Sequence, residues 1–248
     1  MAPEARQGRH RLLRGWLPRL AGVDLESVCE LYGKYAKDLA GVREAQRELL
    51  TTFTGKVKAQ LDDIEAEITY LRIRDTRPRT VVEIGALYGW SATWILRALH
   101  DNGEGHLHSY DLIASSEKHV PADLAKNRTF HHGDVRDKWR DVDPDYVFID
   151  AAHSARFAHW YVKNLFPALK SGTPVSVHDV FHFRWPIPFS EGAVLMRHLA
   201  KSNVPAFTAA KPRRDGAYER LMDVRRDLGL AEPIRDSTDN PMVYFTLP

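Results

Sequence analysis

The sequence contains a single cysteine, Cys29, among its 248 residues. One cysteine cannot form an intramolecular disulfide bond, which excludes the class of disulfide-stabilised secreted domains and suits a reducing cytoplasm. The sequence also lacks any apolar run that approaches the roughly 20 residues of a membrane-spanning helix. We therefore expect a cytoplasmic protein that has no membrane partner.

The chain has no strong charge of either sign. Its formal net charge is +2 at pH 7, and beyond residue 20 the basic residues are dispersed along the sequence. A nucleic-acid-binding surface needs clustered basic residues with interleaved aromatics, so we expect no nucleic-acid partner. A content of 44% hydrophobic and 27% charged residues is ordinary for one well-buried domain with an extra helical region.

The first twenty residues are basic, with five arginines and one glutamate, and lack serine and threonine. Without an apolar core they do not resemble a secretory signal, and a mitochondrial presequence would be rich in serine. An arm that becomes ordered near a ligand fits better. We divide the chain into a basic arm (1–22), a helical region (23–78) and a ligand-binding domain (79–248).

The order of predicted elements indicates an α/β fold. Helical periodicity predicts helices over 23–39 and 42–71, and strands alternate with helices from residue 80 onward. Strands are predicted at 80–84, 105–110, 128–132, 145–149, 174–178, 206–209 and 241–246, and helices at 91–100, 122–126, 155–169, 191–201 and 218–228. This order predicts a Rossmann-like, seven-stranded, mostly parallel sheet with helices on both faces, preceded by N-terminal helices.

The stretch TVVEIGALYGWS, from Thr80 to Ser91, carries the strongest functional signal. Gly85 and Gly89 lie at a predicted strand-to-helix turn, where the absence of a Cβ lets the backbone approach a ligand closely. The start of the following helix offers unpaired N–H groups to an anion such as a carboxylate. We therefore expect a small molecule with an anionic group at this turn.

An acid ends or closely follows each of the first five predicted strands. These acids are Glu83, Asp111, Asp134, Asp150 and Asp179. A single acid there could simply cap a helix, but five on one rim favour a ligand site. Asp111 is placed to accept hydrogen bonds from both hydroxyls of a ribose, and Asp134 could accept one from an adenine amino group. An adenosine-containing ligand is therefore predicted.

The glycine spacing argues against NAD as that ligand. A dinucleotide fingerprint needs Gly-x-Gly-x-x-Gly, so that a pyrophosphate can lie against the helix start. Here Gly85 and Gly89 are four residues apart, and Leu87 stands at the place of the middle glycine. A carboxylate held near Ser91 fits this turn better than a pyrophosphate does.

The motif from Glu83 to Ser91 closely resembles the first motif of class I S-adenosylmethionine-dependent methyltransferases. It is most similar to the catechol and caffeoyl-CoA O-methyltransferase type, and the wider stretch resembles the sugar and other small-molecule O-methyltransferases of natural-product pathways. The segments 148–154 and 177–180 carry the likeness, which covers roughly residues 70–201. The resemblance implies an O-methyltransferase that acts on a hydroxyl of a small molecule, either a sugar or an aromatic natural product.

The resemblance also implies which residues hold S-adenosylmethionine. These are Glu83, Gly85, Ala86, Gly89, Ser91, Asp111, Asp134 and Asp150. Glu83 and Gly85 would lie near the methionine amino group, and Ser91 would help to hold the methionine carboxylate. The alternative for Ser91 is an ordinary helix cap.

A divalent metal site at Asp150, His178 and Asp179 is implied by the metal-dependent members of the family. Histidine at position 178 departs from the family, which usually has aspartate or glutamate there. Oxygen ligands alone favour Mg²⁺, whereas an imidazole shifts the preference toward Mn²⁺, Fe²⁺ or Zn²⁺. Mg²⁺ or Mn²⁺ is the first expectation. The alternative is a strand-end histidine that hydrogen-bonds a loop and binds no metal.

His153 stands where the resembled enzymes have a lysine or histidine general base. An imidazole with an ordinary pKa near 6.5 is suited to removing a proton at neutral pH. The alternative is that His153 caps the helix that begins near Ser154.

The segment 181–189 follows the fifth predicted strand and is rich in aromatic residues. We predict that Phe181, His182, Arg184 and Trp185 contact a ring-bearing acceptor. An interface with another subunit explains the same residues equally well, and we expect a homo-oligomer, a dimer or larger.

Three other functions remain open from the sequence. They are a metal-dependent (iron) oxygenase or hydroxylase on the same fold, an NAD-dependent oxidoreductase, and a non-catalytic partner subunit that keeps the pocket. The sequence does not identify the methyl acceptor or the atom that is methylated.

Overall fold

The computed structural model describes residues 24–139, 142–235 and 240–248. The predicted basic arm, residues 1–22, lies outside the described residues. Within them, seven strands form one sheet in the order β3-β2-β1-β4-β5-β7-β6; β7 pairs antiparallel with both β5 and β6, and the other pairs are parallel. The strands are β1 (Thr80–Ile84), β2 (His106–Asp111), β3 (Arg128–His132), β4 (Tyr146–Ile149), β5 (Pro174–Val177), β6 (Ala206–Phe207) and β7 (Val243–Thr246). The predicted fold class is confirmed.

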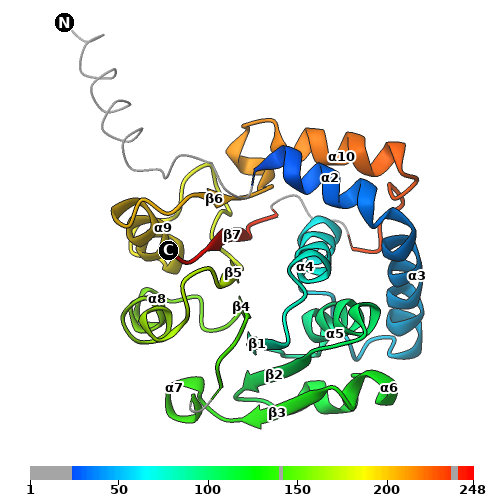
Figure 1. Ribbon diagram of the computed structural model, residues 1–248, viewed down its shortest axis with the longest axis horizontal. Helices are drawn as coiled ribbons and strands as arrows, with labels where there is room; N and C mark the ends of the chain where they lie inside the picture. Colours follow the sequence, from blue (N-terminus) through cyan, green and yellow to red (C-terminus); the bar gives the residue numbers. More distant parts are fainter. Residues whose placement is uncertain (1–23, 140–141, 236–239) are drawn as a thin grey trace, which may run out of the picture.

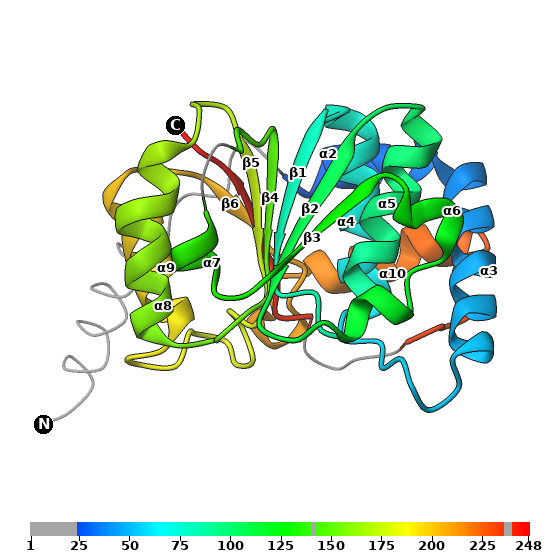
Figure 2. The same cartoon turned by 90° about the horizontal axis from the view of Figure 1, so that it is seen from below.

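Helices cover both faces of the sheet (Figures 1 and 2). One face carries α7 (Val135–Lys138), α8 (Ala155–Trp160) and α9 (Glu191–Lys201). The other carries α4 (Asp63–Thr76), α5 (Trp90–Asn102) and α6 (Ala122–Ala125), with α2 (Leu25–Lys34), α3 (Ala36–Thr52) and α10 (Ala217–Asp227) packed outside them. No helix among the described residues is long and apolar enough to cross a membrane.

The predicted helix over 42–71 is wrong, because the chain leaves the helix between α3 and α4. Gly55 has a left-handed backbone with a φ of 74°, which a helix does not accept. Asp62 then begins α4 with a capping box, in which its side chain accepts from Glu65 N and the Glu65 side chain accepts from Asp62 N. The apolar residues keep a helical spacing across this break, so the sequence pattern does not reveal it.

The predicted helix over 155–169 is regular only in its first part. Ser154 caps α8 by accepting a hydrogen bond from Phe157 N at 3.2 Å. Beyond Trp160 the chain continues as a π turn (Tyr161–Leu165) and a 3₁₀ turn (Phe166–Ala168). Pro167 lies in this last turn and has no backbone N–H to continue an α-helix.

The strand order reverses between β1 and β4, since β2 and β3 lie on one side and β5, β7 and β6 on the other. In an open parallel sheet, this reversal leaves a crevice at the carboxyl ends of the two strands. Gly85 follows β1 and Asp150 follows β4, so the topology places these two residues beside each other at the crevice.

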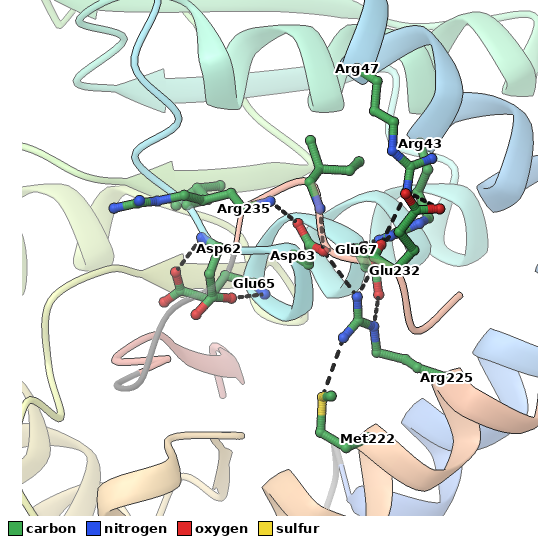
Figure 3. Close-up of polar contacts among 12 residues, drawn as sticks. Arg43, Arg47, Asp62, Asp63, Glu65, Glu67, Met222, Arg225, Glu232 and Arg235 are labelled. Carbon is green, nitrogen blue, oxygen red and sulfur yellow. Dashed lines mark hydrogen bonds and ion pairs between the residues drawn. The ribbon is translucent and has the colours of Figure 1, made fainter. Parts of the chain in front are cut away.

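A buried ionic network joins the outer helices to α4 (Figure 3). Arg225 of α10 lies 2.8 Å from Glu67 and 3.1 Å from Asp63, both on α4. Arg43 of α3 pairs with the same two carboxylates, and Tyr32 of α2 donates to Glu67 at 2.8 Å. All five side chains are buried, so the network fixes the helical layer through mutual pairing of its charges.

Candidate active site

A cavity of about 620 Å³ opens at the crevice between β1 and β4. Residues from the ends of five strands and from the turn after β1 line it. They include Ile84, Gly85, Ala86, Leu87, Trp90, Ser91, Tyr110, Asp111, Leu112, Ile113, Gly133, Asp134, Val135, Arg136, Asp150, Ala151, Ala152, His153, Phe157, His178 and Asp179, together with Gln60. The cavity has the size of a small-molecule or cofactor site.

Asp111 shapes the turn after β1. Its Oδ2 accepts hydrogen bonds from Ala86 N and Leu87 N, both at 2.7 Å, and its Oδ1 accepts from Ile113 N at 2.9 Å. The carboxylate therefore has structural partners on both oxygens while it also lines the cavity. A ribose hydroxyl at this position would share a carboxylate that three backbone N–H groups already hold in place.

The glycine at position 85 is required by the chain itself. Gly85 has a φ of 89°, and a Cβ there would lie 1.8 Å from the Asp150 carbonyl oxygen. Gly89 also has a positive φ, of 88°, and a Cβ there would meet Val120 Cγ2 at 3.1 Å. The close approach of a ligand is therefore not needed to explain either glycine.

Glu83 is fully buried and is not among the residues that line the cavity. Its two carboxylate oxygens accept hydrogen bonds from Ser91 Oγ and Ser109 Oγ, each at 2.6 Å. Burial raises the pKa of Glu83, and the nearby Arg128 opposes that shift. Glu83 thus acts on the cavity only indirectly. It accepts the hydroxyl hydrogen of Ser91, and Ser91 lines the cavity.

Asp134 begins α7 and lines the cavity beside Gly133. Its carboxylate accepts from Arg136 N at 2.9 Å and forms an ion pair with the Arg136 guanidinium at 2.5 Å. Leu112, which is 68% exposed, and Ile113, which is 50% exposed, also line the cavity. Sequence reasoning missed these two apolar side chains, which could cover the face of a flat ring.

Asp150, His153 and Asp179 meet in the lining of the cavity. His153 Nε2 lies 3.4 Å from Asp150 Oδ1 and 3.3 Å from Asp179 Oδ2. One ligand atom from each residue lies within 4.8 Å of the other two, which is a spacing that a single cation can bridge. Two carboxylates and an imidazole fit a divalent metal ion.

His178 lies behind this cluster and is almost fully buried. Its Nδ1 is 3.2 Å from both Asp150 Oδ1 and Asp179 Oδ1, and its Nε2 is 3.3 Å from Glu65 Oε2. Burial alone would lower the pKa of His178, but the surrounding carboxylates, Asp150 first, raise it well above the usual range. The structure therefore brings the three predicted metal residues close together, but the group whose ligand atoms could share one cation contains His153 in place of the predicted His178.

His153 occupies a strained backbone position at the edge of the cavity. Its φ is 41°, and its side chain is 41% exposed. Left-handed backbone is uncommon for a residue other than glycine, and such positions cluster at functional sites. The helix-cap alternative for His153 is wrong, because Ser154 caps α8.

The four residues predicted to contact an acceptor are absent from the cavity lining among the described residues. They are Phe181, His182, Arg184 and Trp185. Phe181 is buried, and the Arg213 guanidinium lies 4.8 Å from the centre of its ring and 5.3 Å from that of Trp185. His182 reaches the cluster, with its Nε2 3.3 Å from Asp179 Oδ1.

Comparison with known proteins finds a similarity over the segment that holds this site. Residues 82–180 match a family model described as a methyltransferase domain. This range includes the turn after β1 and the whole Asp150, His153 and Asp179 cluster. No curated protein matches the chain.

Solved structures share the fold over most of the chain. The O-methyltransferase TomG from Streptomyces achromogenes, in complex with S-adenosylmethionine, is 17% identical with a TM-score of 0.55, and the match covers 85% of this chain and 89% of TomG. The O-methyltransferase from Bacillus cereus, in complex with S-adenosylhomocysteine, is 12% identical with a TM-score of 0.51 and coverages of 91% and 100%. A methyltransferase from Geobacter sulfurreducens is 14% identical with a TM-score of 0.50 and coverages of 84% and 89%.

At these identities the likeness concerns the fold, and the family match concerns residues 82–180. Both agree with the resemblance that the glycine motif carries. The chain therefore shares the α/β fold of these methyltransferase structures, and the segment that holds its candidate site matches the methyltransferase-domain model.

Proposed function

We propose that this protein is an S-adenosylmethionine-dependent O-methyltransferase that methylates a hydroxyl group of a small molecule, either a sugar or an aromatic natural product. The observation that carries the proposal is that one cavity joins the turn after β1 to the cluster of Asp150, His153 and Asp179. A donor at the turn and an acceptor hydroxyl at the cluster would then meet inside the same cavity. TomG, which has the same fold, is an O-methyltransferase with bound S-adenosylmethionine.

The donor would lie along the carboxyl edge of the sheet. The amino-acid tail fits beside Gly85, Ala86, Gly89 and Ser91, with Glu83 behind Ser91. The ribose fits at Asp111, and the adenine fits near Asp134, between the exposed side chains that follow β2 and the start of α7. Asp150 borders both the donor and the metal position.

When bound, S-adenosylmethionine would supply an electrophilic methyl group. A nucleophilic acceptor oxygen would attack its carbon in line with the C–S bond, and S-adenosylhomocysteine would leave as that bond breaks. A divalent cation at the cluster would lower the pKa of the acceptor hydroxyl and fix its position. Asp150 and Asp179 would supply its oxygen ligands, and His178 would hold those two carboxylates from behind. The remaining ligand position falls to His153 Nε2, which faces both carboxylates.

This geometry makes two predicted roles of histidine compete. His153 Nε2 is the nitrogen that faces the cavity, since its Nδ1 lies on the side of Glu191 at 3.5 Å. The same lone pair cannot bind a cation and accept the acceptor proton at once. We propose metal ligation by His153 where a cation is bound and general-base catalysis by His153 where none is.

The methyltransferase match favours this function over the iron oxygenase and the NAD-dependent oxidoreductase. A cytoplasmic location, a homo-oligomeric state and acceptor contact by residues 181–185 stay predictions.

Calorimetry with S-adenosylhomocysteine tests the cofactor assignment. We expect saturable binding of S-adenosylhomocysteine and none of NAD⁺, because Leu87 replaces the middle glycine of a dinucleotide fingerprint. Absence of heat with millimolar S-adenosylhomocysteine would refute the proposal.

Manganese binding tests the metal site separately. We expect Mn²⁺ to bind the wild-type protein, and Asp150→Asn and Asp179→Asn to weaken that binding strongly, as measured by electron paramagnetic resonance. Asp143→Asn is the control, because Asp143 is exposed and pairs with Lys170 away from the cluster. Equal binding by all four proteins would show that the ion binds elsewhere.

A further inference from the structure

Glu191 is a buried carboxylate that neither the sequence motifs nor the proposed chemistry account for. It is the first residue of α9 and is 2% exposed. Neither of its carboxylate oxygens has a hydrogen-bond partner of good geometry among the described residues. A buried carboxylate without partners is costly, so its position calls for an explanation.

The nearest charged partner of Glu191 is His153. Glu191 Oε2 lies 3.5 Å from His153 Nδ1, on the side of the imidazole that faces away from the cavity. The other ring nitrogen, Nε2, faces Asp150 and Asp179. One imidazole thus lies between a buried carboxylate behind it and two cavity carboxylates in front of it.

Three features of the chain fix the start of α9, where Glu191 lies. Ser190 caps α9 by accepting a hydrogen bond from Ala193 N at 3.2 Å, which fixes the first helical turn. Ser190 also forms an antiparallel β-bridge with Ser154, the residue after His153. A Cβ at Gly192 would lie 2.7 Å from the Val180 carbonyl oxygen, so the start of α9 is pressed against the chain that follows β5.

A favourable charge at a helix start is the simpler explanation for an acid at this position. The favourable interaction of an acid with a helix start requires neither a buried carboxylate nor a neighbouring histidine. Glu219, for example, lies in the first turn of α10 with an exposed side chain. Glu191 differs because its carboxylate is buried against the imidazole of His153 and the hydroxyl of Tyr161. Burial and the Glu191 charge together raise the pKa of Tyr161 well above the usual range.

We propose that Glu191 is a positioning residue that accepts the Nδ1 hydrogen of His153 and thereby directs the Nε2 lone pair of His153 into the cavity. Carboxylates hold the outer nitrogen of ligating histidines in this way, and they fix both the tautomer and the ring orientation. The use of that lone pair, for a cation or for a proton, rests on the proposed methyltransferase function. The orientation itself does not.

Nitrogen-15 spectra of histidine-labelled protein test the orientation directly. His153 is assigned by the signal that disappears in His153→Gln, and its tautomer is determined at a pH above its titration, without metal or cofactor. We expect the Nδ1–H tautomer in the wild-type protein. An Nε2–H tautomer, or an even mixture of the two, would overturn the proposal.

Variants at position 191 supply the matched comparison. Glu191→Gln should shift His153 to a mixture or to the Nε2–H tautomer, because its amide can donate to Nδ1, and Glu191→Asp should retain part of the wild-type pattern. Glu219→Gln is the control, since it removes an acid from the first turn of another helix and should leave His153 unchanged. If Glu191→Gln retains the wild-type tautomer, the proposal is wrong. If Glu191→Gln does not fold, the tautomer of His153 in the wild-type protein alone tests the proposal.

The metal affinity of Glu191→Gln links the orientation to the site. Loss of an outer-shell partner typically lowers metal affinity about 10–100-fold, and we expect Mn²⁺ binding to fall in that range. Binding of S-adenosylhomocysteine should stay unchanged, because Glu191 is absent from the cavity lining among the described residues. A protein that shows the Nδ1–H tautomer and binds no S-adenosylhomocysteine would support the orientation and refute only the methyltransferase.

Discussion

Several residues that line the cavity have left-handed backbone. Gly85 has a φ of 89°, and the non-glycine residues Leu87, His153 and Asp179 have φ values of 40°, 41° and 59°. In the three non-glycine residues such a conformation costs free energy and persists only where the surrounding contacts impose it. Here they bring the turn after β1, the end of β4 and the end of β5 to one point.

Gly85→Ala should unfold or strongly destabilise the protein. The new Cβ would lie 1.8 Å from the Asp150 carbonyl oxygen, and no flexible side chain can yield there. Gly103→Ala is the control, because Gly103 has a φ of 73° with nothing within 4 Å of a Cβ, and its cost should stay near 1–2 kcal/mol. Thermal unfolding measures both. Equal melting temperatures would contradict the close approach of the two chain segments.

His153→Ala should slow methyl transfer by about 10²–10⁴-fold if His153 is the general base. The rate under saturating donor and acceptor measures this, with His106→Ala as the control, because the His106 side chain forms a hydrogen bond with Thr129 and His106 is absent from the cavity lining among the described residues. A change below about threefold would exclude the base. Recovery of the lost rate at high Mn²⁺ would instead indicate that His153 acts as a metal ligand.

The residues of the site divide into those that a motif can reveal and those that only the fold brings in. Asp150 and Asp179 lie at predicted strand ends and in segments that resemble a known family, so they could be predicted from the sequence. Glu191 and Glu65 contact histidines of the site from helix starts that are distant in sequence, and no local pattern marks them. The capping box at Asp62 could have indicated Glu65 as a helix residue, but not its contact with His178.

At the scale of helices and strands, the buried ionic network should carry much of the stability of the outer layer. Arg225→Ala would leave the buried Glu67 and Asp63 with one cation fewer, and breaking a buried pair typically costs about 3–5 kcal/mol. Arg226→Ala, next in sequence, removes an exposed pair with Asp223 and should cost less than about 1 kcal/mol. Urea unfolding compares the two. Equal costs would show that the network is not buried in solution.

The cap of α4 predicts an unusual pH dependence of stability. Burial, together with the charge of Glu65, raises the pKa of Asp62 to about 9. The folded protein thus keeps a proton that the unfolded chain loses near pH ~4, and the stabilisation from this group falls as pH rises from there to about 9.

Asp62→Asn removes this proton linkage. We expect its free energy of unfolding, relative to wild type, to increase steadily as pH is raised between those limits. Asp24→Asn is the control, because Asp24 caps α2 at an exposed position and its pKa is lowered by its hydrogen bonds to Ser27. Its difference from wild type should be flat over that pH range. Parallel curves for Asp62→Asn and wild type would contradict the raised pKa.

Strand positions could be predicted better than helix boundaries. Each of the seven predicted strands overlaps a strand of the sheet, since short β-branched runs between turn residues leave little freedom. The helix predicted over 42–71 failed because apolar spacing continued through Gly55 and Asp62. Periodicity reports which face is buried, whereas backbone caps determine where a helix begins and ends.

At the scale of the whole molecule, topology places the site. The reversal of strand order between β1 and β4 creates the cavity, and the two helical layers pack hydrophobic cores against the two faces of the sheet (Figure 2). Alternation of strands and helices predicted this architecture from the sequence. The lining residues that do not lie at strand ends could not be predicted, because they belong to loops whose contacts are set by tertiary packing.

A crystal structure of the protein with S-adenosylhomocysteine tests the central claim most directly. We predict electron density for the amino-acid tail against the turn from Gly85 to Ser91, the ribose at Asp111 and the adenine beside Leu112 and Asp134. The sulfur should then face the cluster of Asp150, His153 and Asp179. Density for the ligand elsewhere, or a cavity that stays free of it at saturating concentration, would contradict the account.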